Sequence, residues 1–234
     1  MYDLLLKNIK DVYRKIANAA MKAGRDPHDI KLIAVTKTVE ADLIVRALEI
    51  GLRVFGENRV QEAVKKVRSE ELGVRSENIT WHLIGHLQKN KAKLAVELFD
   101  VIQSVDSIEL AETINKHAGE IGKKLAVLVQ VKLSDEESKH GVPREKIIEL
   151  LGAMKKMENL NIRGLMTIPP YFDDAQKARP YFRELRELRD KAEKAGFHLP
   201  ELSMGMSNDF GVAIEEGATM VRVGTAIFGE RSQR

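Results

Sequence analysis

Lys37 is the residue of this sequence with the clearest potential for covalent chemistry. It follows an apolar run at residues 32–35 (LIAV), which is typical of a strand buried on both faces. A lysine is rarely buried without a partner, so two interpretations are open. Either the side chain extends from the strand end to water, or its amine forms a Schiff base with a carbonyl compound. This stretch alone favours the first interpretation, and the rest of the chain favours the second.

Two turns rich in glycine and hydroxyl side chains could bind an anion. Residues 203–208 (SMGMSN) precede a helical pattern, and residues 223–226 (VGTA) end the last apolar run. Free N–H groups and the helix dipole favour a phosphate at a helix start. Taken singly, Ser207 is explained as a helix N-cap and Gly224 as part of a tight turn. Taken together on neighbouring strands, the two turns favour a phosphate site.

The histidines His82 and His86 raise the question of a metal. Their spacing of four residues suits a metal site on a helix, whereas residues 80–85 have the pattern of a strand. No further histidine or carboxylate motif completes a set of ligands. We therefore predict no metal site.

The composition limits the classes of protein to which the chain can belong. Its 234 residues are 44% hydrophobic and 31% charged, which is sufficient for one barrel-sized core. The 38 basic and 35 acidic residues nearly balance, which predicts no nucleic-acid-binding surface. There is no cysteine, and no apolar run approaches the roughly 18 residues of a membrane span. Because the N-terminus does not resemble a secretory signal, we expect a soluble cytoplasmic protein.

Short apolar segments alternate with helical patterns along the chain. An amphipathic helix is predicted over residues 2–24, with Leu5, Ile9, Val12 and Ile16 at helical spacing. Eight strands are then predicted, at residues 32–37, 53–56, 80–85, 101–104, 125–131, 162–166, 201–204 and 220–223. This alternation predicts an α/β fold, a single (β/α)8 TIM barrel with an extra N-terminal helix, as one domain over residues 1–234. A doubly wound open sheet is the alternative.

A barrel would bring the candidate residues together. The carboxyl ends of its strands meet on one face, where binding sites are built, and phosphate commonly binds after the seventh and eighth strands. Lys37 ends the first predicted strand, and the two turns follow the seventh and eighth. Pyridoxal 5'-phosphate (PLP) has an aldehyde for a lysine and a phosphate for such turns. We therefore predict that the chain binds PLP.

Several segments resemble the pyridoxal phosphate homeostasis proteins, the YggS/PROSC family, whose single barrel is related to the N-terminal domain of alanine racemase. They are residues 34–37 (AVTK), 55–62 (FGENRVQE), 81–91 (WHLIGHLQKNK), 164–169 (GLMTIP), 202–209 (LSMGMSND) and 220–229 (MVRVGTAIFG). They span nearly the whole chain in the family's order. The resemblance implies a PLP-binding protein of intracellular PLP homeostasis, which buffers or delivers the cofactor.

The resemblance also implies roles for individual residues. Lys37 would hold PLP as a Schiff base, and Asn58 would line the face of the ring. The phosphate would be held by Ser207, Gly224 and Thr225, with Ser203 nearby. The expected partners are PLP itself and PLP-requiring apoenzymes, and the expected oligomeric state is a monomer.

Arg222 would approach the pyridine nitrogen of PLP. An arginine there disfavours a protonated pyridinium and so weakens the ring as an electron sink. Two-base racemisation also needs a proton donor on each face of the substrate carbanion. We find a candidate on one face only, Lys37, and expect no second domain to supply the other. The resemblance therefore implies no efficient turnover. The alternatives are a low-activity PLP-dependent amino-acid racemase and an interaction protein that has lost the ligand.

Overall fold

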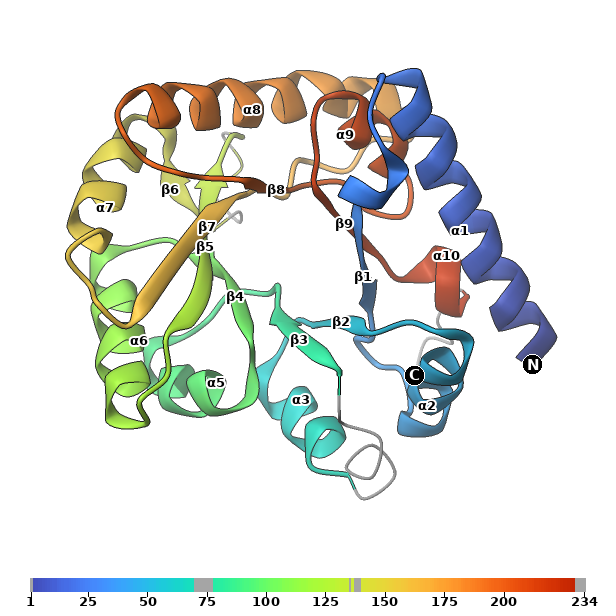
Figure 1. Cartoon of the computed structure of the whole chain (residues 1–234), viewed down its shortest axis with the longest axis horizontal. Helices are drawn as coiled ribbons and strands as arrows, with labels where there is room; N and C mark the ends of the chain where they lie inside the picture. Colours follow the sequence, from blue (N-terminus) through green and yellow to red (C-terminus); the bar gives the residue numbers. More distant parts are fainter. Residues whose placement is uncertain (1, 70–77, 135, 137–139, 230–234) are drawn as a thin grey trace.

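Eight parallel strands close into a ring in the computed structural model, which describes residues 2–69, 78–134, 136 and 140–229. The strands are β1 (Lys31–Val35), β2 (Val54–Glu57), β3 (Thr80–Leu83), β4 (Val101–Val105), β5 (Leu125–Lys132), β7 (Leu160–Met166), β8 (Glu201–Ser203) and β9 (Met220–Val223). Their order is β4-β3-β2-β1-β9-β8-β7-β5, and pairing of β4 with β5 closes the barrel (Figure 1). The predicted barrel is thus confirmed. The two-residue β6 (Val142–Pro143), which pairs with the end of β5, was not predicted.

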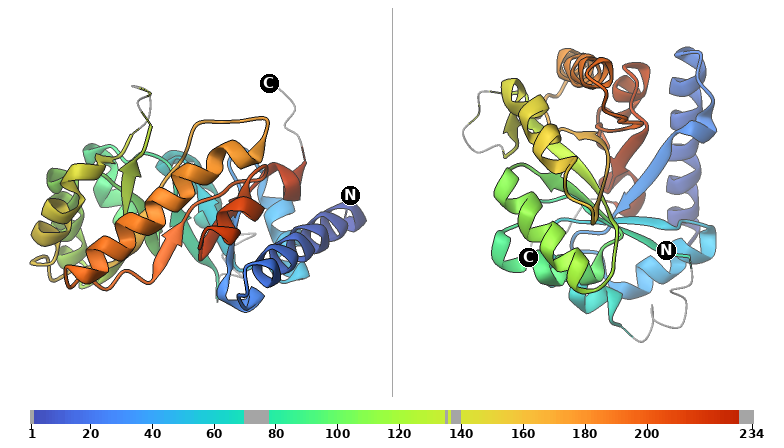
Figure 2. Two further views of the ribbon diagram at one scale, coloured as in Figure 1. Left: turned by 90° about the horizontal axis from the view of Figure 1, so that it is seen from above. Right: turned by 60° about the vertical axis from the view of Figure 1, so that its left-hand side comes forward.

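Helices cover the outside of the ring (Figures 1 and 2). They are α2 (Ala41–Ile50), α3 (Val60–Val67), α5 (Ala92–Leu98), α6 (Ile108–Glu120), α7 (Ile147–Met154), α8 (Arg179–Lys194), α9 (Phe210–Glu215) and α10 (Thr225–Phe228). The helical segment after β7 begins as a 3-10 turn, Ala175–Ala178, and becomes regular at α8. Pro180 lies in the first turn of α8, where its missing N–H has no helical partner to lose. No helix in the part of the chain that the structure describes could span a membrane.

The predicted N-terminal helix is α1 (Tyr2–Lys22), which packs outside the barrel against α9, α10 and α2 (Figure 2). Its apolar stripe is buried, as the helical spacing of Leu5, Ile9 and Ile16 requires. A side-chain hydrogen bond from Asn8 Nδ2 to the carbonyl oxygen of Ile227 (3.0 Å) joins α1 to α10. The N-terminal helix therefore covers the part of the wall next to β1 and β9.

The barrel wall separates an apolar layer from a mixed interior. Side chains alternate along each strand, so the outward set packs beneath the helices, with Phe55, Leu83 and Ile102 fully buried. The inward set combines apolar residues with buried polar ones, namely Ile33, Ile84, Leu128, Met166, Met220, His82, Gln103, Ser203 and Arg222. Buried polar groups need hydrogen-bond partners. Those partners organise the functional site.

Candidate functional site

Lys37 lies just beyond the end of β1 and is half-buried. The backbone N–H of Thr36 donates to the carbonyl oxygen of Gly56 (3.0 Å), which extends the pairing of β1 with β2 by one residue. Thr36 is fully buried against the outer layer, and by strand alternation Lys37 follows on the side of the barrel axis. Among the described residues, no atom accepts a hydrogen bond from Lys37 Nζ. Its amine is therefore open to a ligand.

A buried ion pair fixes the residue before Lys37. Lys66 Nζ on α3 donates to Glu57 Oε1 (2.6 Å) and to the carbonyl oxygen of Thr36 (2.5 Å). The hydroxyl of Thr36 donates to the same Glu57 oxygen (2.5 Å). Burial raises the pKa of the Glu57 carboxyl, and the donors Lys66 and Thr36 oppose that rise. The Glu57–Lys66 pair thus anchors Thr36 through both its side chain and its backbone, which holds the start of the Lys37 turn.

Backbone strain follows directly after Lys37. Thr38 has φ of 60°, and the left-handed region is unfavourable for a β-branched side chain. Such strain is maintained only where the surrounding structure enforces it. The anchored Thr36 on one side and α2 on the other supply that constraint.

Asn58 follows β2, and its side-chain oxygen is unsatisfied. Oδ1 is buried and has no hydrogen-bond partner among the described residues. The backbone of Asn58 packs directly against Gly85, where an added Cβ would lie 2.2 Å from the Asn58 carbonyl oxygen. Only glycine permits that approach. A buried acceptor without a partner is uncommon and suits a position that meets a ligand.

Arg222 on β9 lies inside the barrel and is held by neutral acceptors. One guanidinium nitrogen donates to Ser203 Oγ (2.6 Å) and another to the carbonyl oxygen of Thr167 (2.7 Å). Ser203 in turn donates to Gln103 Oε1 (2.6 Å), and Gln103 Nε2 lies 2.7 Å from His82 Nδ1. Since an amide nitrogen can only donate, His82 accepts at Nδ1. The hydroxyl of Ser203, which was expected near the phosphate, is thus part of a series of hydrogen bonds that orients Arg222.

Burial shifts the pKa values of both ends of this series. Burial lowers the pKa of Arg222 to about 10, and the negative charge of Asp209 opposes the shift. Burial lowers the pKa of His82 to about 3, with a further contribution from Lys31. His82 is therefore neutral at physiological pH. Arg222 carries its charge without a directly bonded carboxylate.

The two predicted phosphate turns meet at Ser207. Its Oγ accepts hydrogen bonds from the backbone N–H groups of Gly224 (3.2 Å) and Ala226 (3.4 Å). The turn before it is tight, because Gly205 has φ of +92° and an added Cβ would lie 2.6 Å from that of Ala213. Thr225 is exposed beside these groups. The turns after β8 and β9 thus converge, as the sequence predicted.

The predicted site residues lie on one continuous arc of the ring. The four strands that carry them are neighbours in the order β2-β1-β9-β8. Ala34 is in register with Val223, and an added Cβ on Gly224 would lie 3.3 Å from the carbonyl oxygen of Val35. The arc therefore brings together all seven candidates: Lys37, Asn58, Ser203, Ser207, Arg222, Gly224 and Thr225. The Glu57–Lys66 pair and Gln103 are supporting residues that sequence reasoning missed, because their contacts join separate elements.

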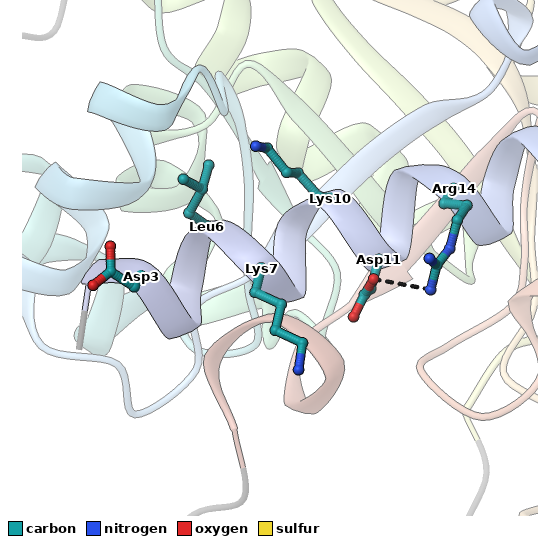
Figure 3. A pocket seen from close by; sticks show the side chains of 6 residues that line it. All are labelled: Asp3, Leu6, Lys7, Lys10, Asp11 and Arg14. Carbon is teal, nitrogen blue, oxygen red and sulfur yellow. Dashed lines mark ion pairs between the residues drawn. The ribbon is translucent and has the colours of Figure 1, made fainter.

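The hollow that runs along α1 is a different feature (Figure 3). Its volume is about 390 Å³, and it is lined by Asp3, Leu6, Lys7, Lys10, Asp11 and Arg14. Its lining charges include an exposed ion pair between Arg14 and Asp11 (3.0 Å). Such pairs contribute little energy in water. The hollow lies on a helix outside the barrel and takes no part in the site at the strand ends.

The closed parallel barrel and this arc define an alanine-racemase-like barrel. Residues 6–232 match the family described as alanine racemase, N-terminal domain. A pyridoxal phosphate homeostasis protein of Aquifex aeolicus is 43% identical over 226 residues, covering 96% of this chain and 97% of that protein. The chain belongs to the pyridoxal phosphate homeostasis proteins within the alanine racemase N-terminal domain family.

Solved structures agree with this assignment. The structure of PipY from Synechococcus elongatus PCC7942 with PLP bound superposes with a TM-score of 0.81 at 41% identity, covering 92% of this chain and 100% of that one. An alanine racemase from Clostridium difficile 630 has a TM-score of 0.73 at 19% identity. This chain spans 99% of its own length but only 58% of the racemase in that comparison. The second likeness concerns the fold alone.

Proposed function

We propose that this protein binds PLP covalently through Lys37 and serves intracellular PLP homeostasis by buffering or delivering the cofactor. The observation that carries the proposal is the Lys37 amine, which has no hydrogen-bond acceptor among the described residues and lies one strand away from the Ser207–Gly224 turn. An amine condenses with the PLP aldehyde to form a Schiff base and release water. Relatives named for PLP homeostasis and the PLP-bound PipY structure support the same ligand.

The residues of the arc fit the groups of PLP. The backbone N–H groups of Gly224 and Ala226 point at the hydroxyl of Ser207, and a phosphate bound at this turn would share these donors. The unsatisfied Oδ1 of Asn58 suits a polar edge near the ring. Arg222, held in place by Ser203, suits the pyridine nitrogen.

The same residues favour a carrier over an efficient racemase. A buried, permanently charged Arg222 at the pyridine nitrogen would keep that nitrogen unprotonated and weaken the ring as an electron sink. Delivery requires acceptors, which in this proposal are PLP-requiring apoenzymes in the cytoplasm. We treat the carrier as a monomer, which size-exclusion chromatography with light scattering would test.

Borohydride trapping tests the covalent link. We expect PLP-loaded wild-type protein to gain one PLP-sized mass after reduction, on the peptide that contains Lys37. Lys37→Ala should lose this adduct. Lys132→Ala is the matched control, because Lys132 also lies at the carboxyl end of a barrel strand, and it should keep the adduct. An undiminished adduct in Lys37→Ala would contradict the proposal.

Pyridoxal, which lacks the phosphate, tests the role of the turn at Ser207. Charge-assisted hydrogen bonds contribute roughly 1.5–3 kcal/mol each. Pyridoxal should therefore bind at least about tenfold more weakly than PLP, because 1.4 kcal/mol corresponds to a factor of about ten. Equal affinities would exclude a phosphate site at this turn.

Hydrogen exchange at a substrate carbon tests the absence of efficient turnover. L-alanine incubated with PLP-loaded protein in deuterated water should take up deuterium slowly, without accumulation of D-alanine. Deuterium uptake and D-alanine formation at ordinary enzyme rates of about 1–10³ per second would establish a racemase instead.

A further inference from the structure

A second group of side chains lies at the barrel mouth, on the part of the ring that follows β2 and the proposed PLP site. His86 follows β3, Asp106 follows β4, and His140 lies between β5 and β6. β3, β4 and β5 are consecutive in the ring, and β4 and β5 lie across it from β1 and β9 (Figure 1). One ligating atom from each of the three side chains lies within 4.8 Å of the other two.

Two contacts hold the backbone at His140 and Gly141 against the end of β5. Gln130 Nε2 donates to the carbonyl oxygen of His140 (3.0 Å). Gly141 has φ of +136°, and an added Cβ would lie 2.6 Å from the backbone nitrogen of Lys132. A glycine is required there, and it holds the backbone beside His140 close against the end of β5. The strand ends of β3 and β4 place His86 Nδ1 3.6 Å from Asp106 Oδ2.

We propose that His86, Asp106 and His140 form a binding site for a late first-row divalent transition metal ion, with Zn²⁺ as the reference ion. Imidazole nitrogen and carboxylate oxygen are preferred ligands of this class. Two histidines and one carboxylate form a three-ligand set that leaves a coordination position for water or another ligand. The ion would tie the ends of three adjacent strands together.

Metal binding requires a small rearrangement of the imidazoles. The rings of His86 and His140 stack with centroids 3.8 Å apart and planes 11° apart. The lone pairs of an imidazole lie in its plane, so two parallel rings do not point at one ion. A rotation of either ring about its side-chain bonds brings the ligand atoms to converge, at metal distances of about 2.0–2.2 Å. Both histidines are exposed, so packing does not oppose this rotation.

The convergence of three strands distinguishes this group from an ordinary histidine–carboxylate pair. His117 and Glu120 on α6 also form such a pair, at 2.8 Å. They belong to one helix, and the described residues offer no third ligand within the same range. Sequence reasoning predicted no metal because it considered His82 together with His86. In the fold, His82 faces Gln103 inside the barrel, and the partners of His86 follow later strands.

Calorimetric titration with Zn²⁺ tests the site. The sample is the tag-free, PLP-free chain, because the phosphate of free PLP would itself compete for the metal. Wild-type protein should bind one ion per chain, and His86→Asn or His140→Asn should each weaken binding by roughly 10–100-fold or more. His117→Asn is the matched control and should bind as wild type does. Equal affinity in wild type and the His86→Asn/His140→Asn double variant would overturn the proposal.

Cobalt spectroscopy provides an independent readout. Co²⁺ bound by nitrogen and oxygen ligands in a site of low coordination number develops visible absorption. A new visible band should appear with wild type and with His117→Asn, and should be absent from the double variant. Circular dichroism of each variant verifies the fold, which exposed positions should leave unchanged. The absence of a cobalt band in folded wild-type protein would exclude the site.

Discussion

The two sides of the barrel mouth that meet in the proposed PLP site are stabilised in different ways. The lysine side comprises Thr36, Lys37, Glu57 and Lys66, and its supporting charges pair with each other behind the barrel wall. The arginine side comprises His82, Gln103, Ser203 and Arg222, and its charge lies inside the barrel among neutral hydrogen-bond partners. The turn at Lys37 is therefore held by a buried ion pair, whereas Arg222 is held by neutral hydrogen-bond partners.

The difference indicates what each side can tolerate. A buried ion pair is costly to break, because the remaining charge stays in a medium of low polarity. A buried cation without a bonded carboxylate already bears a desolvation cost, as the lowered pKa of Arg222 shows. An anionic ligand nearby would offset part of that cost. The ion pair on the lysine side thus holds that side in place without a ligand. The arginine side is the one that a bound anion would stabilise more.

Breaking the ion pair on the lysine side should have the largest effect. Glu57→Ala leaves Lys66 buried without its carboxylate, and we expect the free energy of unfolding to fall by about 3–5 kcal/mol. Urea denaturation measures this change. The double variant Glu57→Leu/Lys66→Met removes both charges and should regain most of the loss. A single-variant loss below about 1 kcal/mol would mean that the pair behaves as a solvent-exposed one.

Acid should destabilise the arginine side through His82. Its folded-state pKa of about 3 lies below its ordinary value of 6.5. Between these values the unfolded chain binds a proton that the folded chain does not, so stability falls as pH decreases from 6.5. The contribution is about 1.4 kcal/mol per pH unit, or about 2 kcal/mol by pH 5.

The variant His82→Leu isolates this term from those of the carboxylates. The unfolding free energies of wild type and His82→Leu are compared from pH 7 to pH 5. Wild type should lose stability relative to the variant as the pH falls. A pH-independent difference would show that His82 titrates normally.

Removing the buried cation should cost less than breaking the ion pair. Arg222→Met relieves the desolvation of the guanidinium but leaves Ser203 and the carbonyl oxygen of Thr167 without a donor. We expect the unfolding free energy to change by no more than about 1.5 kcal/mol, whereas affinity for PLP falls. Denaturation and PLP titration of the same sample measure both. A loss as large as that of Glu57→Ala would remove the contrast between the two sides.

The smallest expected effect on stability is at Ser207. Ser207→Ala deletes the acceptor for two backbone N–H groups, at Gly224 and Ala226, which water can reach. The free energy of unfolding should therefore fall by about 0.5–1.5 kcal/mol. Affinity should fall more for PLP than for pyridoxal, and equal losses for the two ligands would contradict a phosphate contact.

The sequence was sufficient to predict the elements and the position of the candidate residues at the strand ends. Strand and helix periodicity predicted all eight barrel strands and α1. The end of the last strand at Val223 was correctly located, whereas β1 ends at Val35, two residues before its predicted end at Lys37. It did not predict β6 or the 3-10 turn at Ala175–Ala178, because short elements depend on pairing and capping more than on periodicity.

Local pattern by itself determined the alternation of strands and helices, because side-chain periodicity is a property of neighbouring residues. The motifs at Lys37 and Ser207 are also made of neighbouring residues, so the sequence alone was enough to predict a PLP site from them. Only the tertiary structure decided which buried polar groups meet. Ser203 and Gln103 are 100 residues apart in the chain, and His86 meets Asp106 and His140, which follow two other strands. Such contacts depend on strand order and register around the closed ring, which periodicity does not specify.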